Sequence, residues 1–283
     1  MNALLERAVQ VFFKLIIGIL QKFGPGRLIV EQLSNAINES TSIIRHCGHR
    51  FEFVTPNRIT YFRARSFSQK EPETLNWIDS FETGCVFWDV GANVGIYSLY
   101  AAKTRMARVF AFEPSVFNLE LLSKNIYRNN LVDRVTIVPV PLTDHVGDSE
   151  FSLSTTAWGG ALSVFGENFG FDNSPINEVF KYWMVGMPAD AVVANLKVPP
   201  PDYLKIDVDG IEHLILKGAK LTLRSVRSVL VEVNHDFREQ YEDVEKFMRA
   251  AGFALLEETR SALFENNERF DNSFNQIWVR VND

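Results

Sequence analysis

Cysteine is scarce in this sequence of 283 residues, which contains only Cys47 and Cys85. Two cysteines form neither a disulfide framework nor a cysteine-ligated metal cluster. Internal repeats, low-complexity segments and a cleavable signal peptide are also lacking. We therefore expect a globular protein of a reducing compartment, the cytoplasm, in which Cys85 is a small buried apolar residue.

A long apolar run is missing as well. Residues 4–23 are apolar on nearly every side, but Lys14 interrupts them and the Gly-Pro-Gly sequence of residues 24–26 ends them. The uninterrupted part is shorter than the ~20 residues that a membrane-spanning helix needs, and a central lysine is costly there. We expect a helix that does not span a membrane. It is either buried, against the body or in a homo-oligomer, or it lies at a membrane interface. The second interpretation relies on four basic residues: Arg7, Lys14, Lys22 and Arg27.

Basic residues are fewer than acidic ones, so that the net charge is −6 and the pI is about 5.5. This balance argues against nucleic acid as a partner. The charge is unevenly distributed. Residues 1–70 contain ten Lys or Arg against four Glu (+6), so that the remainder contains 29 − 10 = 19 basic and 35 − 4 = 31 acidic residues (−12). A basic N-terminal arm therefore precedes an acidic body, and 46% hydrophobic content can fill the core of one α/β domain.

The stretch CVFWDVGANVGIYSLYA, residues 85–101, is the centre of the pattern. It begins with β-branched and aromatic residues, which predict a buried parallel strand containing Asp89. Gly91 and Gly95 then allow a tight turn close to a ligand, and apolar residues at helical spacing follow. A strand, a glycine turn and a helix N-terminus together predict a cradle for an anionic or nucleotide ligand.

The next predicted strand, residues 109–112, ends in Glu113, which follows Gly91 by 113 − 91 = 22 residues. A nucleotide-binding fold places an acidic residue for the ribose hydroxyls about 20 residues after its glycine turn. The turn has the pattern D-x-G-x-N-x-G, with Asn93 where a dinucleotide-binding fold needs its middle glycine. The predicted residues for a cofactor other than a dinucleotide are Asp89, Gly91, Asn93, Gly95 and Glu113.

A second group of polar residues follows the predicted strand at residues 203–206. Asp207 and Asp209 lie two apart at its end and Glu212 follows, which is typical of a catalytic or metal-binding cluster. Asp209 and Glu212 also have the spacing of a capping box before an apolar helix, so each can instead satisfy helix N-terminal donors. Asp207 lacks this role, and we expect it to lie closest to the chemistry.

The following strand, residues 228–233, leads into a further polar group of Glu232, Asn234 and His235. Histidine is a common general base in enzymes, so His235 is a second candidate proton acceptor. Oxygen ligands at adjacent strand ends suit magnesium, so Asp207, Glu232 and Asn234 are a candidate metal site.

Two segments interrupt the α/β pattern. Residues 50–67 alternate in polarity around Thr55, Pro56 and Asn57, which predicts a β-hairpin. Residues 150–197 contain many aromatic residues among glycine and asparagine, and such a segment over a fixed scaffold is where specificity often resides. Aromatic faces beside amides suit stacking on sugars. A hydrophobic cap that packs on itself is the alternative.

Three motifs in order, DVGANVGIYSL, FEPS and LKIDVDGIE, resemble those of the FkbM family of class I S-adenosylmethionine-dependent methyltransferases. The resemblance covers roughly residues 50–281. It implies a Rossmann-like α/β fold with a seven-stranded, mostly parallel sheet and a closing antiparallel hairpin. It also implies S-adenosylmethionine on the glycine turn and on Glu113, with its adenine beside Asp144, a candidate acceptor for the adenine amino group.

We therefore predict an N-terminal helical extension at residues 1–49 and a methyltransferase domain at residues 50–283, in which residues 150–197 form an insertion or cap on the substrate side. The expected reaction methylates a hydroxyl of a sugar, glycan, glycolipid or other small acceptor. Proton removal is expected from Asp207 or His235, or with the help of a Mg²⁺ ion, and Glu212 is a further candidate catalytic residue. Two alternatives stay open: a nicotinamide-dependent oxidoreductase, disfavoured by the missing middle glycine, and a catalytically silent S-adenosylmethionine-binding module, disfavoured by the retained carboxylates.

Overall fold

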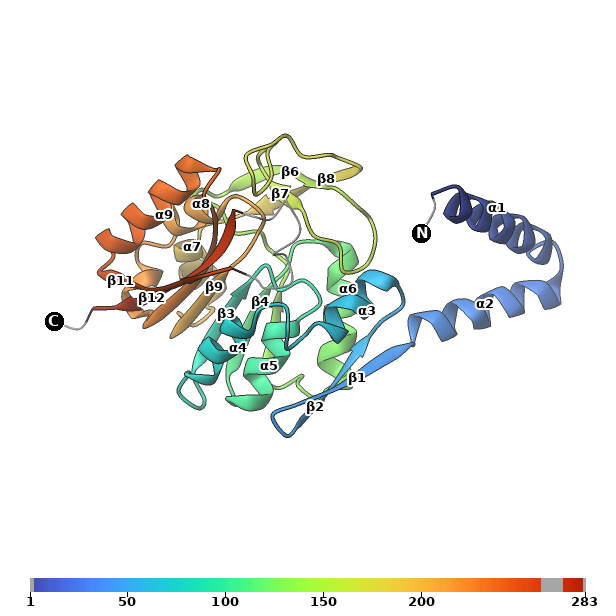
Figure 1. Ribbon diagram of the computed structural model, residues 1–283, viewed down its shortest axis with the longest axis horizontal. Helices are drawn as coiled ribbons and strands as arrows, with labels where there is room; N and C mark the ends of the chain where they lie inside the picture. The colour runs from blue at the N-terminus through green and yellow to red at the C-terminus, as the bar shows by residue number, and fades with distance from the viewer. Residues whose placement is uncertain (1–2, 261–271, 282–283) are drawn as a thin grey trace.

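A seven-stranded sheet forms the centre of the molecule in the computed structural model, which describes residues 3–260 and 272–281 (Figure 1). The strand order is β11-β12-β10-β9-β3-β4-β5. Strand β12 is antiparallel to both of its neighbours, and the other pairs are parallel. The strands are β3 (Val86–Val90), β4 (Arg108–Phe112), β5 (Val135–Val138), β9 (Tyr203–Ile206), β10 (Ser228–Asn234), β11 (Phe253–Thr259) and β12 (Ser273–Arg280). The predicted sheet, with its closing antiparallel pair, is confirmed.

The side on which the chain adds strands changes at β3, which places a topological switch point between β3 and β9. Strands β4 and β5 lie on one side of β3, and all later strands of the sheet lie on the other side. Open α/β sheets bind ligands at such a switch point, outside the carboxyl ends of the strands. The glycine turn after β3 and the polar residues after β4 and β9 therefore meet at one edge.

Two layers of helices cover the two faces of the sheet (Figure 1). One layer contains α4 (Pro72–Asp79), α5 (Ile96–Thr104) and α6 (Val116–Arg128); the other contains α7 (Ala189–Leu196), α8 (Glu212–Lys217), α9 (Arg238–Ala250) and the short 3₁₀ helix η1 (Thr222–Ser225). Side chains alternate along the strands, so that Phe87 and Val109 pack toward the first layer and Trp88 and Phe110 toward the second. Each large apolar side chain buried in this way stabilises the fold by about 1.5–3 kcal/mol.

A second, antiparallel sheet of three strands lies beside the switch point. Its strands, in spatial order, are β7 (Ser163–Phe165), β6 (Gly147–Leu153) and β8 (Phe180–Gly186). Phe151 and Phe165 join the core on the side of α7, α8 and α9. Most of the predicted insertion at residues 150–197 belongs to this sheet and its loops, whereas Val192 of α7 packs in the main core.

The N-terminal hairpin is displaced from its predicted position. It consists of β1 (Thr41–His46) and β2 (His49–Val54), which turn at Cys47 and Gly48, and helix α3 (Arg58–Arg65) follows. The prediction of a hairpin across residues 55–57 was wrong because Asn57 caps this helix. Its side chain accepts a 2.8 Å hydrogen bond from the Thr60 amide, and the Thr60 hydroxyl accepts one from the Asn57 amide in return.

Helices α1 (Ala3–Leu20) and α2 (Gly24–Asn38) form an arm that projects away from the body (Figure 1). The predicted helix at residues 4–23 is thus present, but its burial against the body is contradicted, since Phe12 is 59% and Leu15 is 63% exposed. An exposed ion pair between Glu6 and Arg58 connects α1 to α3. None of the helices in the described part of the chain is both long enough and apolar enough to cross a membrane.

Candidate active site

A cavity of about 430 Å³ opens at the switch point. Its lining combines the glycine turn after β3, residues at the ends of β4, β9 and β10, helix α3, and the segment between β6 and β7. Five predicted site residues line it: Gly91, Asn93, Glu113, Asp207 and Glu232. Six others are outside the lining that the described residues form: Asp89, Gly95, Asp144, Glu212, Asn234 and His235.

The glycine turn brings the ends of β3 and β9 into close contact. Gly91 has a φ of +85°, and a Cβ there would lie 1.8 Å from the carbonyl oxygen of Asp207. Gly95 has a φ of +86°, and its Cβ would lie 2.6 Å from Leu122 of α6. Only glycine fits at these two positions, so the turn can pass beneath a ligand and enter α5 directly.

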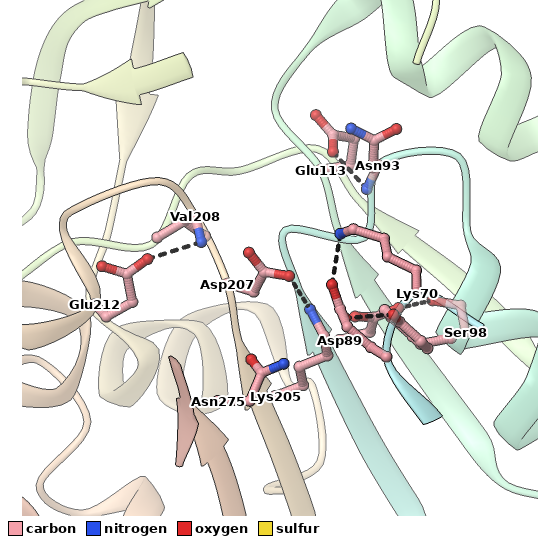
Figure 2. A network of polar contacts seen from close by, with 12 residues as sticks. Lys70, Asp89, Asn93, Ser98, Glu113, Lys205, Asp207, Val208, Glu212 and Asn275 are labelled. Carbon is pink, nitrogen blue, oxygen red and sulfur yellow. Dashed lines mark hydrogen bonds and ion pairs between the residues drawn. The ribbon is translucent and has the colours of Figure 1, made fainter. Parts of the chain in front are cut away.

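Glu113 is buried beside the turn and is tied to it. Its carboxylate accepts a 2.7 Å hydrogen bond from the Asn93 amide (Figure 2), and the Ser115 amide donates a second one, also at 2.7 Å. Burial raises the pKa of Glu113 to about 7, against the opposing effect of these bonds. A carboxylate has about four acceptor sites, so it can still accept hydrogen bonds from ribose hydroxyls on its cavity side.

Asp89, in strand β3, is hydrogen-bonded to helix α5, which follows the glycine turn. It is fully buried, and its carboxylate accepts a 2.6 Å hydrogen bond from the Ser98 hydroxyl in the first turns of α5. Burial raises the pKa of Asp89, against the opposing effects of Lys205 and of this hydrogen bond. Asp89 therefore holds β3 and α5 together behind the cavity.

Asp207 lies at the end of β9, where it is held by a buried lysine (Figure 2). The Lys205 ammonium donates a 2.6 Å hydrogen bond to its carboxylate, and the Lys205 side chain is only 1% exposed. Burial would raise the pKa of Asp207, but Lys205 and Lys70 lower it to about 2. Burial and the nearby Asp207 charge raise the pKa of Glu232 well above its usual value, so that Glu232 carries the proton of this carboxyl pair.

A second ion pair lies next to the first. The Lys70 ammonium contacts the Glu71 carboxylate at 2.5 Å, and the Tyr97 hydroxyl donates a hydrogen bond to the same carboxylate. Lys70 and Glu71 both line the cavity. Neither was predicted, and neither was Lys205, although a lysine inside the apolar strand YLKI is a signal that could have been used.

The residues present do not fit the predicted magnesium site. The Asn234 amide is engaged elsewhere, since it accepts a 2.8 Å bond from the Asp236 amide and contacts the Ser273 hydroxyl at 3.3 Å. Lys205 already places a positive charge against Asp207. No group of three or more His, Cys, Asp or Glu side chains among the described residues is arranged to hold a metal ion.

Asp209 and Glu212 both accept hydrogen bonds from backbone amides, but from different segments of the chain. Asp209 accepts hydrogen bonds from the Leu162 and Ser163 amides at 2.7 and 3.3 Å, so its predicted capping of α8 is wrong. Burial, followed by the charge of Asp207, raises the pKa of Asp209 to about 6. Glu212 accepts bonds from the Val208 and Gly210 amides within its own turn, and burial raises its pKa to about 7.

His235 and Asp144 lie away from the cavity. The His235 ring stacks on Phe274 with centroids 4.3 Å apart, and its Nε2 is 3.3 Å from Glu258. The Asp144 carboxylate is paired with Lys217 at 2.7 Å and with His145 at 2.8 Å. Phe274 lines the cavity, but His235 and Asp144 do not, and their predicted roles in proton removal and adenine recognition stay predictions.

One loop closes over the glycine turn, and we call its central residues 158–160 the strap. Asn93 and Asn118 both donate to the Gly160 carbonyl, at 2.7 and 3.1 Å. Arg63 donates to the Gly159 carbonyl at 2.7 Å, and Asn57 to the Trp158 carbonyl at 2.9 Å. The strap is thus bound to α3, to α6 and to the cofactor turn at once.

A switch-point cavity with a glycine turn and a buried ribose-type carboxylate is typical of Rossmann-like enzymes that bind a nucleoside cofactor. The family model for the methyltransferase FkbM domain matches residues 89–255, more than half of the chain. The chain therefore belongs to the FkbM-domain methyltransferases, as its motifs predict, and S-adenosylmethionine is the cofactor of this class. This membership excludes the nicotinamide-dependent alternative.

Two curated relatives illustrate the match. The hexuronic acid methyltransferase AglP of Haloferax volcanii is 28% identical over 199 residues, which are 69% of this chain and 75% of that protein. The 31-O-demethyl-FK506 methyltransferase FkbM of Streptomyces tacrolimicus is 27% identical over 207 residues, 65% of this chain and 78% of that protein. Among solved structures, a precorrin-6y C5,15-methyltransferase from Geobacter metallireducens is similar with 14% identity and a TM-score of 0.44, over 75% of this chain and 87% of that one.

Proposed function

We propose that the protein transfers the methyl group of S-adenosylmethionine to a hydroxyl of a sugar, glycan or other small acceptor. The observation that carries this proposal is the composition of the cavity at the switch point. The cofactor residues Gly91, Asn93 and Glu113 and the carboxyl pair of Asp207 and Glu232 face the same space. A donor and a hydroxyl could therefore meet there.

The residues of the turn fit the donor. Gly91 lets the turn pack directly against the end of β9, and the Asn93 Oδ1 atom is buried without a hydrogen-bond partner in the described part of the chain. When bound, S-adenosylmethionine supplies a methyl group on a cationic sulfur, which transfers by in-line displacement. Glu113 would accept the ribose hydroxyls.

Asp207 and Glu232 would hold the acceptor hydroxyl. With a pKa of about 2, Asp207 is a weak base, so it takes the proton late, once the new carbon–oxygen bond has made that oxygen strongly acidic. Glu232, which is protonated, can donate a hydrogen bond to the same oxygen and orient it. Lys205 keeps Asp207 ionised and fixed in direction.

The rim of the cavity favours a hydroxyl-rich acceptor. Ser154, Thr155, Ser163, Ser273 and Asn275 all line it, and they offer donors and acceptors suited to a polar ligand. The predicted substrate-side cap at residues 150–197 supplies the first three. The name of the Haloferax relative, a hexuronic acid methyltransferase, agrees with a sugar acceptor.

Turnover assays test this function. The release of S-adenosylhomocysteine is measured with uronic acids, neutral sugars, glycolipids and small alcohols, and at least one hydroxyl acceptor is expected to support it. Donor binding without turnover on any of these would support the silent binding module instead.

We further propose that the arm, residues 3–38, docks on an anionic membrane surface rather than on a second copy. Its apolar side chains are exposed along both helices. Up to residue 30 it contains four basic residues and one acidic residue, Glu6, which is paired with Arg58. Anionic headgroups complement this charge. The free cysteines Cys47 and Cys85 agree with a cytoplasmic protein.

A further inference from the structure

A small side chamber of about 50 Å³ lies between α3, the glycine turn and the start of α5. Its lining includes the cationic residues Arg63, Lys70 and Lys205, the carboxylate Asp207, and Gly91 and Asn93 of the turn. Arg63 and Lys70 also line the large cavity, so the side chamber adjoins the proposed donor site. Lys205 is paired with Asp207 and Lys70 with Glu71, so that Arg63 adds a positive charge beside the turn that would carry the donor.

Arg63 lines both the side chamber and the large cavity, and only part of its guanidinium is hydrogen-bonded to the described residues. Its Nε donates to the Gly159 carbonyl at 2.7 Å, which fixes the direction of the side chain. The two terminal nitrogens of its guanidinium form no hydrogen bond or ion pair with the residues that the structure describes. Such a fork matches the two oxygens of a carboxylate. The Lys70 ammonium, in contact with Glu71, adds charge beside it.

Asn93 offers the complementary group. Its Nδ2 donates to the Gly160 carbonyl at 2.7 Å, and this bond determines which side of the amide is oxygen. Its Oδ1 is buried, and no hydrogen-bond partner for it is found among the described residues. A buried acceptor without a donor is costly, and an ammonium group would satisfy it.

We propose that Arg63, with Lys70, is a carboxylate-binding site for the amino-acid end of S-adenosylmethionine, and that Asn93 Oδ1 accepts its ammonium group. This assignment rests on the proposed function, because it needs the donor in the adjoining cavity. A uronic-acid acceptor is another source of a carboxylate. The methionine end is favoured because the glycine turn lines the same chamber. Helix α3 would then complete the donor site, although it precedes the matched family domain at residues 89–255.

Ligand truncation tests the assignment. S-adenosylhomocysteine contains the amino-acid group, whereas 5′-methylthioadenosine lacks it. Calorimetry on the full-length protein should show that Arg63→Gln weakens S-adenosylhomocysteine about 10- to 100-fold and changes 5′-methylthioadenosine less than twofold. Arg63→Lys should restore part of the loss. Arg65→Gln, an exposed arginine on the same helix, is the matched control and should change neither affinity.

Other results would overturn the assignment in distinct ways. Equal weakening of both ligands would mean that Arg63 acts only by holding the strap. Unchanged affinities together with a raised KM for a uronic acid, but not for a neutral sugar, would assign the carboxylate to the acceptor. Failure of the wild-type protein to bind either nucleoside would overturn the proposed function itself.

Discussion

A lysine inside a buried strand is costly unless carboxylates surround it. Lys205 meets this condition because Asp207, Asp89 and Glu71 all act on its charge, and against burial they raise its pKa above the usual value. Its ammonium supplies the positive charge that a metal ion supplies in other carboxylate clusters. Asp207 was predicted to lie closest to the chemistry. In the structure it also balances the buried charge of Lys205.

The Lys205 and Asp207 side chains should be strongly coupled in stability. Asp207→Asn removes the carboxylate that contacts the buried ammonium and should lower the free energy of unfolding by about 3 kcal/mol. Lys205→Met with Asp207→Asn should cost at least ~1 kcal/mol less than the sum of the single changes. Urea unfolding of the four proteins measures this. The exposed pair Lys217 and Asp144, changed in the same way, should show coupling below ~1 kcal/mol. Additive losses at Lys205 and Asp207 would contradict the ion pair.

Glu113 should make donor binding depend on pH. Burial raises its pKa to about 7, and hydrogen bonds from ribose hydroxyls favour the ionised form. Below this value the carboxyl must first release a proton, so affinity for S-adenosylhomocysteine should rise about tenfold from pH 6 to pH 8 and then level off. Calorimetry over this range measures the slope. Glu113→Gln cannot ionise and should bind more weakly at pH 8 with a flat profile; a retained slope would assign the titration to another group.

At the scale of elements, local patterns were enough for the sheet but not for the strap. Strand β3 and its turn could be predicted because apolar runs and positive-φ glycines are properties of neighbouring residues. The hairpin was misplaced because Asn57 was interpreted as a turn residue, whereas it caps α3 together with Thr60. Arg63 and Asn118 gave no signal at all, since their partners lie 96 and 41 residues away in the chain.

Asn118 should control how long a ligand stays under the strap. Its amide binds the strap with both ends, accepting from the Gly159 amide at 3.0 Å and donating to the Gly160 carbonyl at 3.1 Å. Asn118→Ala removes both bonds, so the dissociation rate of S-adenosylhomocysteine should increase about tenfold. Stopped-flow displacement measures it. Ser123→Ala, at an exposed position of the same helix, should leave the rate unchanged. An unchanged rate in Asn118→Ala would mean that the strap does not gate release.

At the scale of the whole molecule, the arm should direct the acidic body to a membrane. Full-length protein should sediment with vesicles of phosphatidylserine and phosphatidylcholine, and less so as salt increases. Changing Lys14, Lys22 and Arg27 to Gln should abolish this binding. The matched control changes three basic residues of the body, Lys197, Lys220 and Lys246, to Gln and should retain it. A stable dimer without vesicle binding would instead assign the arm to a second copy.

The cavity takes its lining from almost the whole length of the chain, from Ile59 in α3 to Asn275 in β12. Of the seven strands in this sheet β12 comes last along the chain, yet it lies between β10 and β11. A chain emerging from the ribosome therefore has no complete site until its final strand has inserted, and contacts of such long sequence separation form slowly. Cofactor can stabilise only finished molecules. The concentration of S-adenosylmethionine in the cell should thus influence how much of the newly made protein survives proteolysis, before any acceptor is methylated.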